Sequence, residues 1–176
     1  MARRQSAPGG GAVAAVTVSV AAGLVAMAAR FSTDLLADGE KLVDDADRLR
    51  ARAAALADAD AAAYGAVIAA YAAARESDQV AGRERVRTAL VRASEVPLEV
   101  AEIGAETARL AGRLAAEGKR DIRGDATTAL LLAEAATRSA AHLVAVNVEA
   151  GGGEKELVRR VARSVAVARD AAAGVE

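Results

Sequence analysis

Asp60 is the residue whose type and position most suggest chemistry. It falls on an apolar seam whose other members, spaced by three and four residues, are Leu42, Ala46, Leu49, Ala53, Leu56, Ala63, Val67 and Ala70. An ionised carboxylate on such a seam is costly unless it is paired, and burial raises its pKa toward the range of a useful acid or base. Two interpretations follow: an acid–base group in a dry site, or one half of a structural ion pair with an arginine of another helix.

Three consecutive glycines form a second candidate site. Gly9, Gly10 and Gly11 stand directly before an uncharged run over residues 12–29, which is typical of a buried helix. A glycine-rich turn at the start of a helix leaves backbone N–H groups unpaired at the positive end of the helix dipole, where an anionic or carbonyl ligand is favoured. The alternative is a flexible start to the helix that binds nothing.

Two further polar residues have structural explanations. Asp125 follows Gly124 and is placed as the N-cap of a helix, a role that needs no ligand. His142, the single histidine, shares an i,i+4 stripe with Glu134 and Arg138, as is typical of a solvent-facing helix surface. We therefore expect a capping role for Asp125 and an exposed position for His142.

The composition of the 176 residues excludes several classes of site. There is no cysteine, which rules out disulfides, thiolate nucleophiles and cysteine-bound zinc, and fits a reducing, cytoplasmic compartment. Aromatic residues make up 2% of the chain and the formal net charge is -1, so we expect no nucleic-acid partner. The single histidine leaves no histidine-rich metal site.

Helices with short connections account for the chain. Only two prolines interrupt an Ala-, Leu-, Arg- and Glu-rich sequence without strand-type alternation. We expect an all-α fold, a multi-helix bundle with long antiparallel helices, in a single domain over residues 1–176. Breaks near residues 39, 82, 94–97, 118–125 and 151–153 predict helices over approximately residues 12–29, 40–74, 83–93, 97–118, 125–148 and 154–173.

The uncharged run near the N-terminus has three interpretations. Arg3 and Arg4 precede it and it ends in small residues, as in a secretory signal, and its length also suits one transmembrane helix. Against both, the run is mostly Ala, Val and Gly, contains Thr17 and Ser19, and is separated from the arginines by Pro8 and the glycines. We favour a helix buried in a bundle, with no membrane contact.

Short motifs occur in a fixed order along nearly the whole chain. They are Pro8-Gly9-Gly10-Gly11, Asp60-Ala61-Ala62-Ala63-Tyr64, Val96-Pro97-Leu98, Gly118 with Gly124-Asp125, and Asn147-Val148. The set resembles the cyclodeaminase/cyclohydrolase family of folate enzymes, which includes the C-terminal half of formiminotransferase-cyclodeaminase and stand-alone methenyltetrahydrofolate cyclohydrolases. The family pattern has serine, asparagine and serine where this chain has Ala12, Lys119 and Gly124.

The resemblance implies an all-α homodimer that binds a tetrahydrofolate derivative in a cleft near the subunit interface and needs neither a metal nor a redox cofactor. It assigns the acid–base role to Asp60, and substrate binding to Gly9, Gly10, Gly11, Tyr64 and Asp125. The reaction is hydrolysis of 5,10-methenyltetrahydrofolate, which we favour because the 176 residues include no transferase, or ring-closing deamination of 5-formiminotetrahydrofolate. The alternative is a homodimer that keeps the fold, has lost the chemistry and acts as a binding or interaction protein.

Overall fold

Five α-helices and one short 3-10 turn make up the described part of the chain. The computed structural model describes residues 9–76, 78–152 and 155–174. The elements are α1 (Gly10–Arg30), α2 (Gly39–Ala74), α3 (Gln79–Glu117), η1 (Arg120–Ile122), α4 (Arg123–Gly151) and α5 (Lys155–Ala172). The prediction of an all-α fold is confirmed. Arg3, Arg4 and Pro8 lie outside the described residues, as do the end of the predicted break at 151–153 and the first residue of the predicted helix over 154–173.

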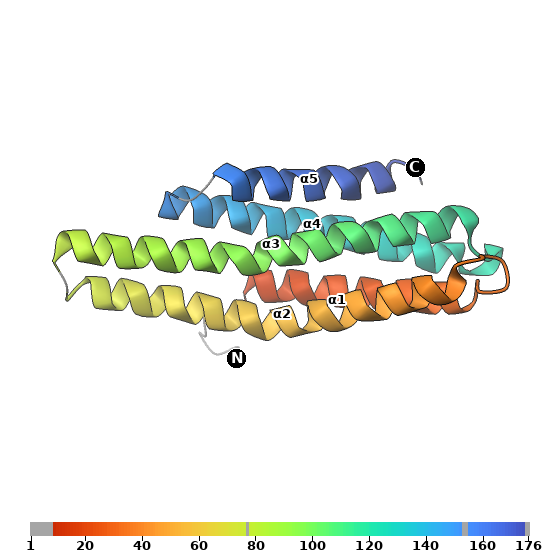
Figure 1. Ribbon diagram of the computed structural model, residues 1–176, viewed down its shortest axis with the longest axis horizontal. Coiled ribbons are helices and arrows are strands. Elements are labelled where there is room, and N and C mark those ends of the chain that lie inside the picture. Colours follow the sequence, from red (N-terminus) through yellow and green to blue (C-terminus); the bar gives the residue numbers. More distant parts are fainter. Residues whose placement is uncertain (1–8, 77, 153–154, 175–176) are drawn as a thin grey trace, which may run out of the picture.

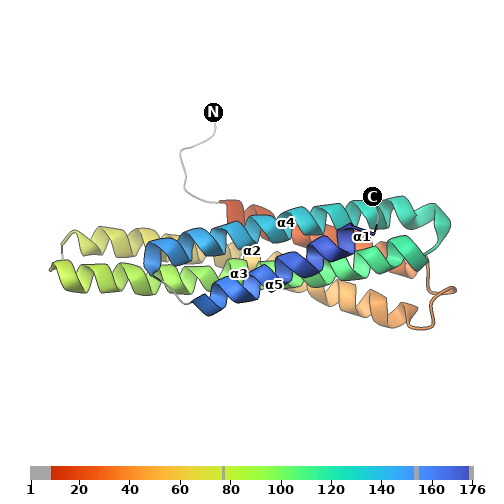
Figure 2. The same ribbon diagram turned by 90° about the horizontal axis from the view of Figure 1, so that it is seen from above.

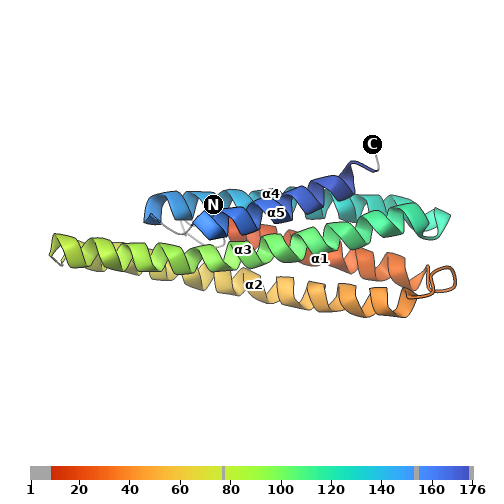
Figure 3. The ribbon, with the colours of Figure 1, turned by 45° about the horizontal axis from the view of Figure 1, so that its top comes forward.

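The long helices run antiparallel to their neighbours along the chain (Figure 1). The first four helices form a bundle, and α5 packs on α3 and α4, as Figure 2 shows from above. Figure 3 shows that α2 and α3 extend beyond the other helices on the side of their connecting turn. Because α1 is shorter than α2, its first turn lies beside the middle of α2, and this position places the candidate site (Figure 1).

Small apolar side chains fill the centre of the bundle. In α1, the side chains of Ala15, Val18, Ala21, Ala22 and Val25 are fully buried. Side chains of this size let helix axes approach closely, so their many contacts stabilise the bundle without large residues. The predicted buried helix over residues 12–29 is confirmed, and the observed helix begins two residues earlier and ends one residue later.

Three helical segments in the described chain have the length and apolar composition that a membrane span requires: Gly10–Arg30, Gly39–Ala74 and Arg120–Gly151. In α1, 56% of the most apolar stretch is buried inside the bundle. The large apolar side chains that stay more than half exposed on this helix are Val13, Val16 and Val20, which recur at helical spacing. The other helices therefore cover most of α1 and leave one row of valines uncovered.

The connection between α2 and α3 is shorter than predicted. The carboxylate of Asp78 accepts hydrogen bonds from the N–H groups of Val80 and Ala81 and so caps α3. Gly82 therefore lies inside the first turns of α3, and the predicted break at this residue is wrong. A Cβ on Gly82 would lie 3.0 Å from the carbonyl oxygen of Ala74, so the missing side chain lets the ends of the two helices approach closely.

A proline lies inside α3, so the predicted helix start at Ser94–Pro97 is wrong. Pro97 has no N–H to donate to the carbonyl of Ala93, one turn earlier. The side-chain amide of Asn147 in α4 donates to this carbonyl instead, at 3.1 Å. Because the freed acceptor has a new donor, α3 continues without interruption to Glu117.

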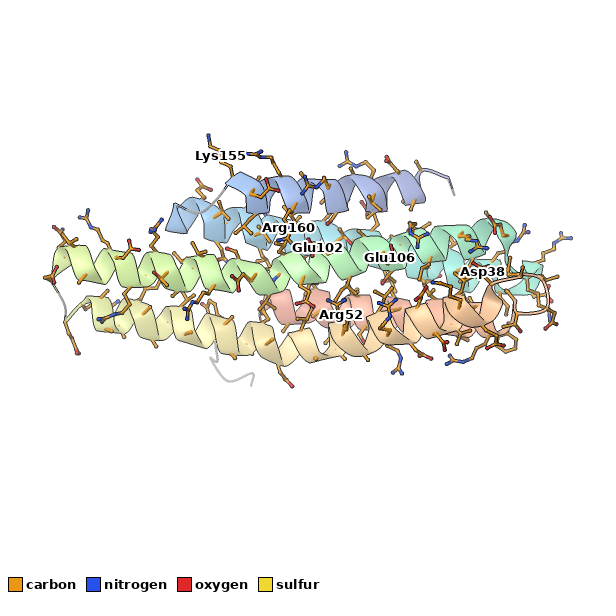
Figure 4. All side chains as sticks on the ribbon, in the orientation of Figure 1. Asp38, Arg52, Glu102, Glu106, Lys155 and Arg160 are labelled. Atoms are coloured by element: carbon orange, nitrogen blue, oxygen red, sulfur yellow. The ribbon has the colours of Figure 1, made fainter. Side chains whose placement is uncertain are left out.

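Ion pairs connect the helices at the surface. Arg160 of α5 contacts Glu102 of α3 at 2.7 Å, and Arg52 of α2 contacts Glu99 of α3 at 2.6 Å. Figure 4 shows Arg160, Glu102 and Arg52 on neighbouring helices of the bundle. These side chains are about half exposed, and a pair of this kind adds only on the order of 0.5 kcal/mol, so the buried core provides most of the stability.

Candidate functional site

A cavity of about 490 Å³ lies where the start of α1 meets α2, α3 and α4. The predicted site residues Gly9, Gly10, Gly11, Asp60 and Tyr64 all line it, although they come from two distant parts of the chain. The rest of the described lining is small or apolar apart from a tyrosine and an asparagine, and consists of Ala61, Ala63, Val67, Ile68, Tyr71, Leu90, Ala93, Pro97, Leu143, Val146, Asn147 and Ala150. An apolar cleft of this size with a few polar groups is typical of a small-molecule site.

The carboxylate of Asp60 is held against the first turn of α1. The backbone N–H of Ala12 donates to Oδ2 of Asp60 at 2.9 Å, so Asp60 caps α1 from another helix. Burial raises the pKa of Asp60 above its ordinary value of 3.8, and the hydrogen bond from Ala12 opposes this effect. Among the described residues no arginine or lysine pairs with Asp60, which leaves the ion-pair interpretation without a partner. A half-buried carboxylate without a counter-ion is suited to take up and release a proton.

Glycine is required at position 11 by space rather than by backbone conformation. A Cβ on Gly11 would lie 2.7 Å from Oδ2 of Asp60 and closer still to Oδ1 and Cγ, so the carboxylate occupies the place of a side chain. A Cβ on Gly10 would meet only Leu143, at an ordinary 3.7 Å. Gly10 and Gly11 are helical, and the positive φ among the described residues belongs to Gly152. The expected glycine turn is therefore the first turn of α1, built to admit the Asp60 carboxylate.

Tyr64 stands one turn after Asp60 and begins a partly apolar wall on α2. Ile68 and Tyr71 continue the same face at helical spacing, and all three side chains line the cavity. Each is just under half exposed, so the wall is also open to solvent. Aromatic rings at such a position offer a flat apolar surface and a hydroxyl group to a planar heterocycle. The sequence analysis did not predict Tyr71 as a site residue. Its spacing of seven residues from Tyr64 places it on the same helix face and is the sequence signal that could have identified it.

Asp125 does not join the other predicted residues. It is the third residue of α4 and is exposed, and Ile122 occupies the N-cap position, so the predicted cap is wrong. Leu143 of the same helix lies beside Gly10. About 27 Å of helix separates Asp125 from Leu143 at a rise of about 1.5 Å per residue. Asp125 therefore lies far from the cavity of the same chain, and its charge favours the positive end of α4.

The remaining polar residues of α4 differ in their relation to the cavity. His142 is exposed, which confirms the prediction. Asn147 lines the cavity, whereas the sequence placed it in a motif without a role. In the described ranges, no three His, Cys, Asp or Glu side chains lie together as metal ligands would. Asn147 is thus a second functional candidate that sequence reasoning missed, and its hydrogen bond to the carbonyl of Ala93 is the feature that identifies it.

Comparisons with known proteins agree with this fold. The family model described as formiminotransferase-cyclodeaminase matches residues 1–166. A methenyltetrahydrofolate cyclohydrolase of Methylorubrum extorquens is 30% identical over 150 residues, which cover 81% of this chain and 72% of that protein. The crystal structure of formiminotetrahydrofolate cyclodeaminase from Thermotoga maritima matches with a TM-score of 0.87 and 25% identity, covering 98% of this chain and 88% of the other. The chain therefore belongs to the formiminotransferase-cyclodeaminase family.

Proposed function

We propose that this chain hydrolyses 5,10-methenyltetrahydrofolate to 10-formyltetrahydrofolate. The observation that carries the proposal is the Asp60 carboxylate, half-buried beside the start of α1 in the cavity and without a cationic partner among the described residues. The methenyl substrate has a positive charge shared by its reacting carbon and the two adjacent nitrogens, and an unpaired carboxylate attracts this charge. The relative from Methylorubrum extorquens, a methenyltetrahydrofolate cyclohydrolase, supports the same reaction.

Asp60 supplies the proton transfers in this mechanism. Its carboxylate takes a proton from a water molecule as the water oxygen bonds to the methenyl carbon, which becomes tetrahedral. The protonated carboxyl group then donates to the ring nitrogen at position 5 as the bond between this nitrogen and the carbon breaks. The remaining hydroxyl proton leaves to solvent, and the formyl group stays on the nitrogen at position 10. The apolar lining limits competing contacts with bulk water around the reacting atoms.

The other groups of the cavity bind and orient the substrate in this proposal. The first-turn backbone of Gly9, Gly10 and Gly11 and the positive end of α1 stabilise negative charge on the attacking oxygen. The ring of Tyr64 faces the folate heterocycle. The steps are proton transfers and an addition to carbon, which require neither a metal nor a redox cofactor. The lack of cysteine fits a reducing compartment, and we place the protein in the cytoplasm.

Ring-closing deamination of 5-formiminotetrahydrofolate is the second candidate. It is favoured by the structural match to the Thermotoga maritima protein, a formiminotetrahydrofolate cyclodeaminase. This reaction also passes through a tetrahedral carbon between two folate nitrogens, and Asp60 would protonate the nitrogen that leaves as ammonia. The same cavity therefore serves both reactions, and a direct comparison of the two substrates decides between them.

A spectrophotometric assay tests the proposed function. Hydrolysis removes the ultraviolet absorbance of 5,10-methenyltetrahydrofolate, so we expect the purified protein to accelerate this decay well above the uncatalysed rate. Ammonia release from 5-formiminotetrahydrofolate, measured in parallel, identifies a cyclodeaminase. Decay at the background rate with no folate binding by calorimetry would remove both reactions and leave the alternative of a binding or interaction protein.

We infer that the protein is a homodimer in which the exposed valines of α1 are covered by a second copy of the chain. Val13, Val16 and Val20 are 51–59% exposed, and the first two border a shallow groove together with Ala57 and Ala61 of α2. Neighbouring apolar side chains on one face are typical of an interface, whereas single ones are ordinary. Because Asp125 lies far from the cavity of its own chain, it would bind substrate in such a dimer only at the cavity of the second subunit.

Replacing Val16 by aspartate should weaken dimerisation at least about a hundredfold, because the dimer would bury an unpaired charge. The monomer should keep its fold, since Val16 is 51% exposed within one subunit. Light scattering at micromolar concentration measures the change. Val158→Asp is the matched control, because Val158 is also exposed but lies on α5, which packs on α3 and α4. A monomeric parent protein, or one retained on lipid vesicles, contradicts the inference.

A further inference from the structure

Asn147 is a polar side chain of the cavity to which the proposed mechanism gives no role. It is half-buried on α4, and its amide nitrogen Nδ2 donates to the carbonyl oxygen of Ala93 at 3.1 Å. This carbonyl is available because residue 97, one turn later in α3, is a proline without an N–H. Pro97 thus frees an acceptor that Asn147 occupies, and both residues line the cavity.

The contact with Ala93 decides which way the amide faces. A carbonyl oxygen only accepts hydrogen bonds, so the NH2 group of Asn147 faces Ala93 and Oδ1 faces away from it. Within the described residues, no group donates a hydrogen bond to Oδ1 of Asn147. Because every fully buried side-chain oxygen in this part of the chain has a hydrogen-bond partner, Oδ1 is not fully buried and is accessible in the cavity that Asn147 lines. The carboxylate of Asp60 on α2 and the fixed amide oxygen of Asn147 on α4 are therefore acceptors on different walls of the cavity.

We propose that Asn147 binds the substrate by accepting a hydrogen bond at Oδ1 from an N–H group of the substrate heterocycle. The pterin ring of a tetrahydrofolate has such donors, whereas the carbon that reacts has none. Asn147 therefore orients the ring while Asp60 acts on the reacting carbon. This role rests on the proposed function, and it assigns recognition of ring N–H groups to a residue inside the cavity of the same subunit. Because one N–H of the amide is held by the carbonyl of Ala93, Oδ1 stays turned away from Ala93 and offers a fixed acceptor to N–H groups of the ligand.

A purely structural role for Asn147 is the explanation to exclude. Asn147→Ala removes both the donor to Ala93 and the acceptor for the ligand, so this variant alone does not separate the two roles. Pro97→Ala separates them, because alanine restores an N–H one turn after Ala93 and this N–H can take over the carbonyl. The double-mutant cycle of Pro97→Ala and Asn147→Ala is therefore the informative experiment.

In the Pro97→Ala background, Asn147→Ala should no longer lower the melting temperature appreciably, but should still weaken ligand binding about tenfold, the effect of one lost hydrogen bond. Binding is measured as KM for 5,10-methenyltetrahydrofolate and as Kd for 5-formyltetrahydrofolate by calorimetry. We expect KM to rise with little change in kcat. Glu149→Ala, exposed on the same helix, is the matched control and should change neither value.

Asn147→Asp gives a second test that does not depend on the proline variant. Aspartate keeps an oxygen acceptor for the ligand but cannot donate to Ala93 when ionised. A binding role predicts a smaller loss of affinity than in Asn147→Ala, and a structural role predicts a loss at least as large. Affinity that recovers fully in the Pro97→Ala background would overturn the proposal and leave the proposed function standing. A parent protein that binds neither folate would overturn both.

Discussion

Replacement of Asp60 by asparagine is expected to lower the turnover of 5,10-methenyltetrahydrofolate by about a hundredfold or more, the usual effect of losing a proton-transfer group. Asparagine has nearly the shape of aspartate, and its side-chain oxygen can still accept from the N–H of Ala12. The helix content and the melting temperature should therefore change little. Initial rates at saturating substrate, together with circular dichroism, measure the two quantities separately.

The pH dependence of the rate tests the same role for Asp60. Burial raises the pKa of this carboxyl group, so kcat/KM should fall as the pH drops through a midpoint above 3.8, where the base becomes protonated. The Asp60→Asn variant should lack this acid limb, because its amide takes up no proton in this range. An acid limb that persists unchanged in the variant would assign the titration to another group.

Asp60→Leu distinguishes catalysis from capping. Leucine cannot accept from the N–H of Ala12, so this variant should lose about 1–3 kcal/mol of unfolding free energy as well as its activity. The Asp60→Asn variant keeps an acceptor and should lose activity alone. If both variants retained full activity and both melted at a much lower temperature, Asp60 would have a structural role only.

Gly11→Ala is expected to be the second most damaging change, although it adds a single methyl group. The new Cβ would fall where the Asp60 carboxylate lies, 2.7 Å from Oδ2. Asp60 must then turn away, which breaks its hydrogen bond with Ala12 and removes the carboxylate from the reacting carbon. We expect kcat to fall by about ten- to a hundredfold, the usual effect of a misplaced catalytic group.

Gly65→Ala is the matched control for this substitution. A Cβ on Gly65 meets nothing within 4 Å, and alanine in a helix interior stabilises by about 0.5–1 kcal/mol relative to glycine. This variant should keep its activity and melt slightly higher. The turnover of the Gly10→Ala variant should lie between those of Gly11→Ala and Gly65→Ala, because the new Cβ would only touch Leu143. Equal turnover in the Gly11→Ala and Gly65→Ala variants would show that the exact place of the carboxylate has no effect on the reaction.

Local patterns in the sequence were sufficient to predict the fold class and three helices. The bounds of α1, α2 and α5 agree with the predicted ranges to within two residues. Periodicity of apolar residues and glycine breaks operate within one or two helical turns, so a short window of sequence contains them. The apolar seam of α2 also predicted that Asp60 faces other helices, and it lines the cavity with the glycines and Tyr64.

Only the tertiary structure decided three further points. Pro97 breaks a helix by local rules, yet α3 continues because Asn147, 54 residues after Ala93, supplies the missing donor. Gly11 is needed because the Asp60 carboxylate, from another helix, fills the space of its side chain. Asp125 belongs to the same ordered motifs, but the length of α4 holds it far from the cavity of the same chain. In the first two cases a contact between helices, which no local pattern contains, determines the outcome. In the third case the rigid length of α4 sets the distance between Asp125 and the cavity.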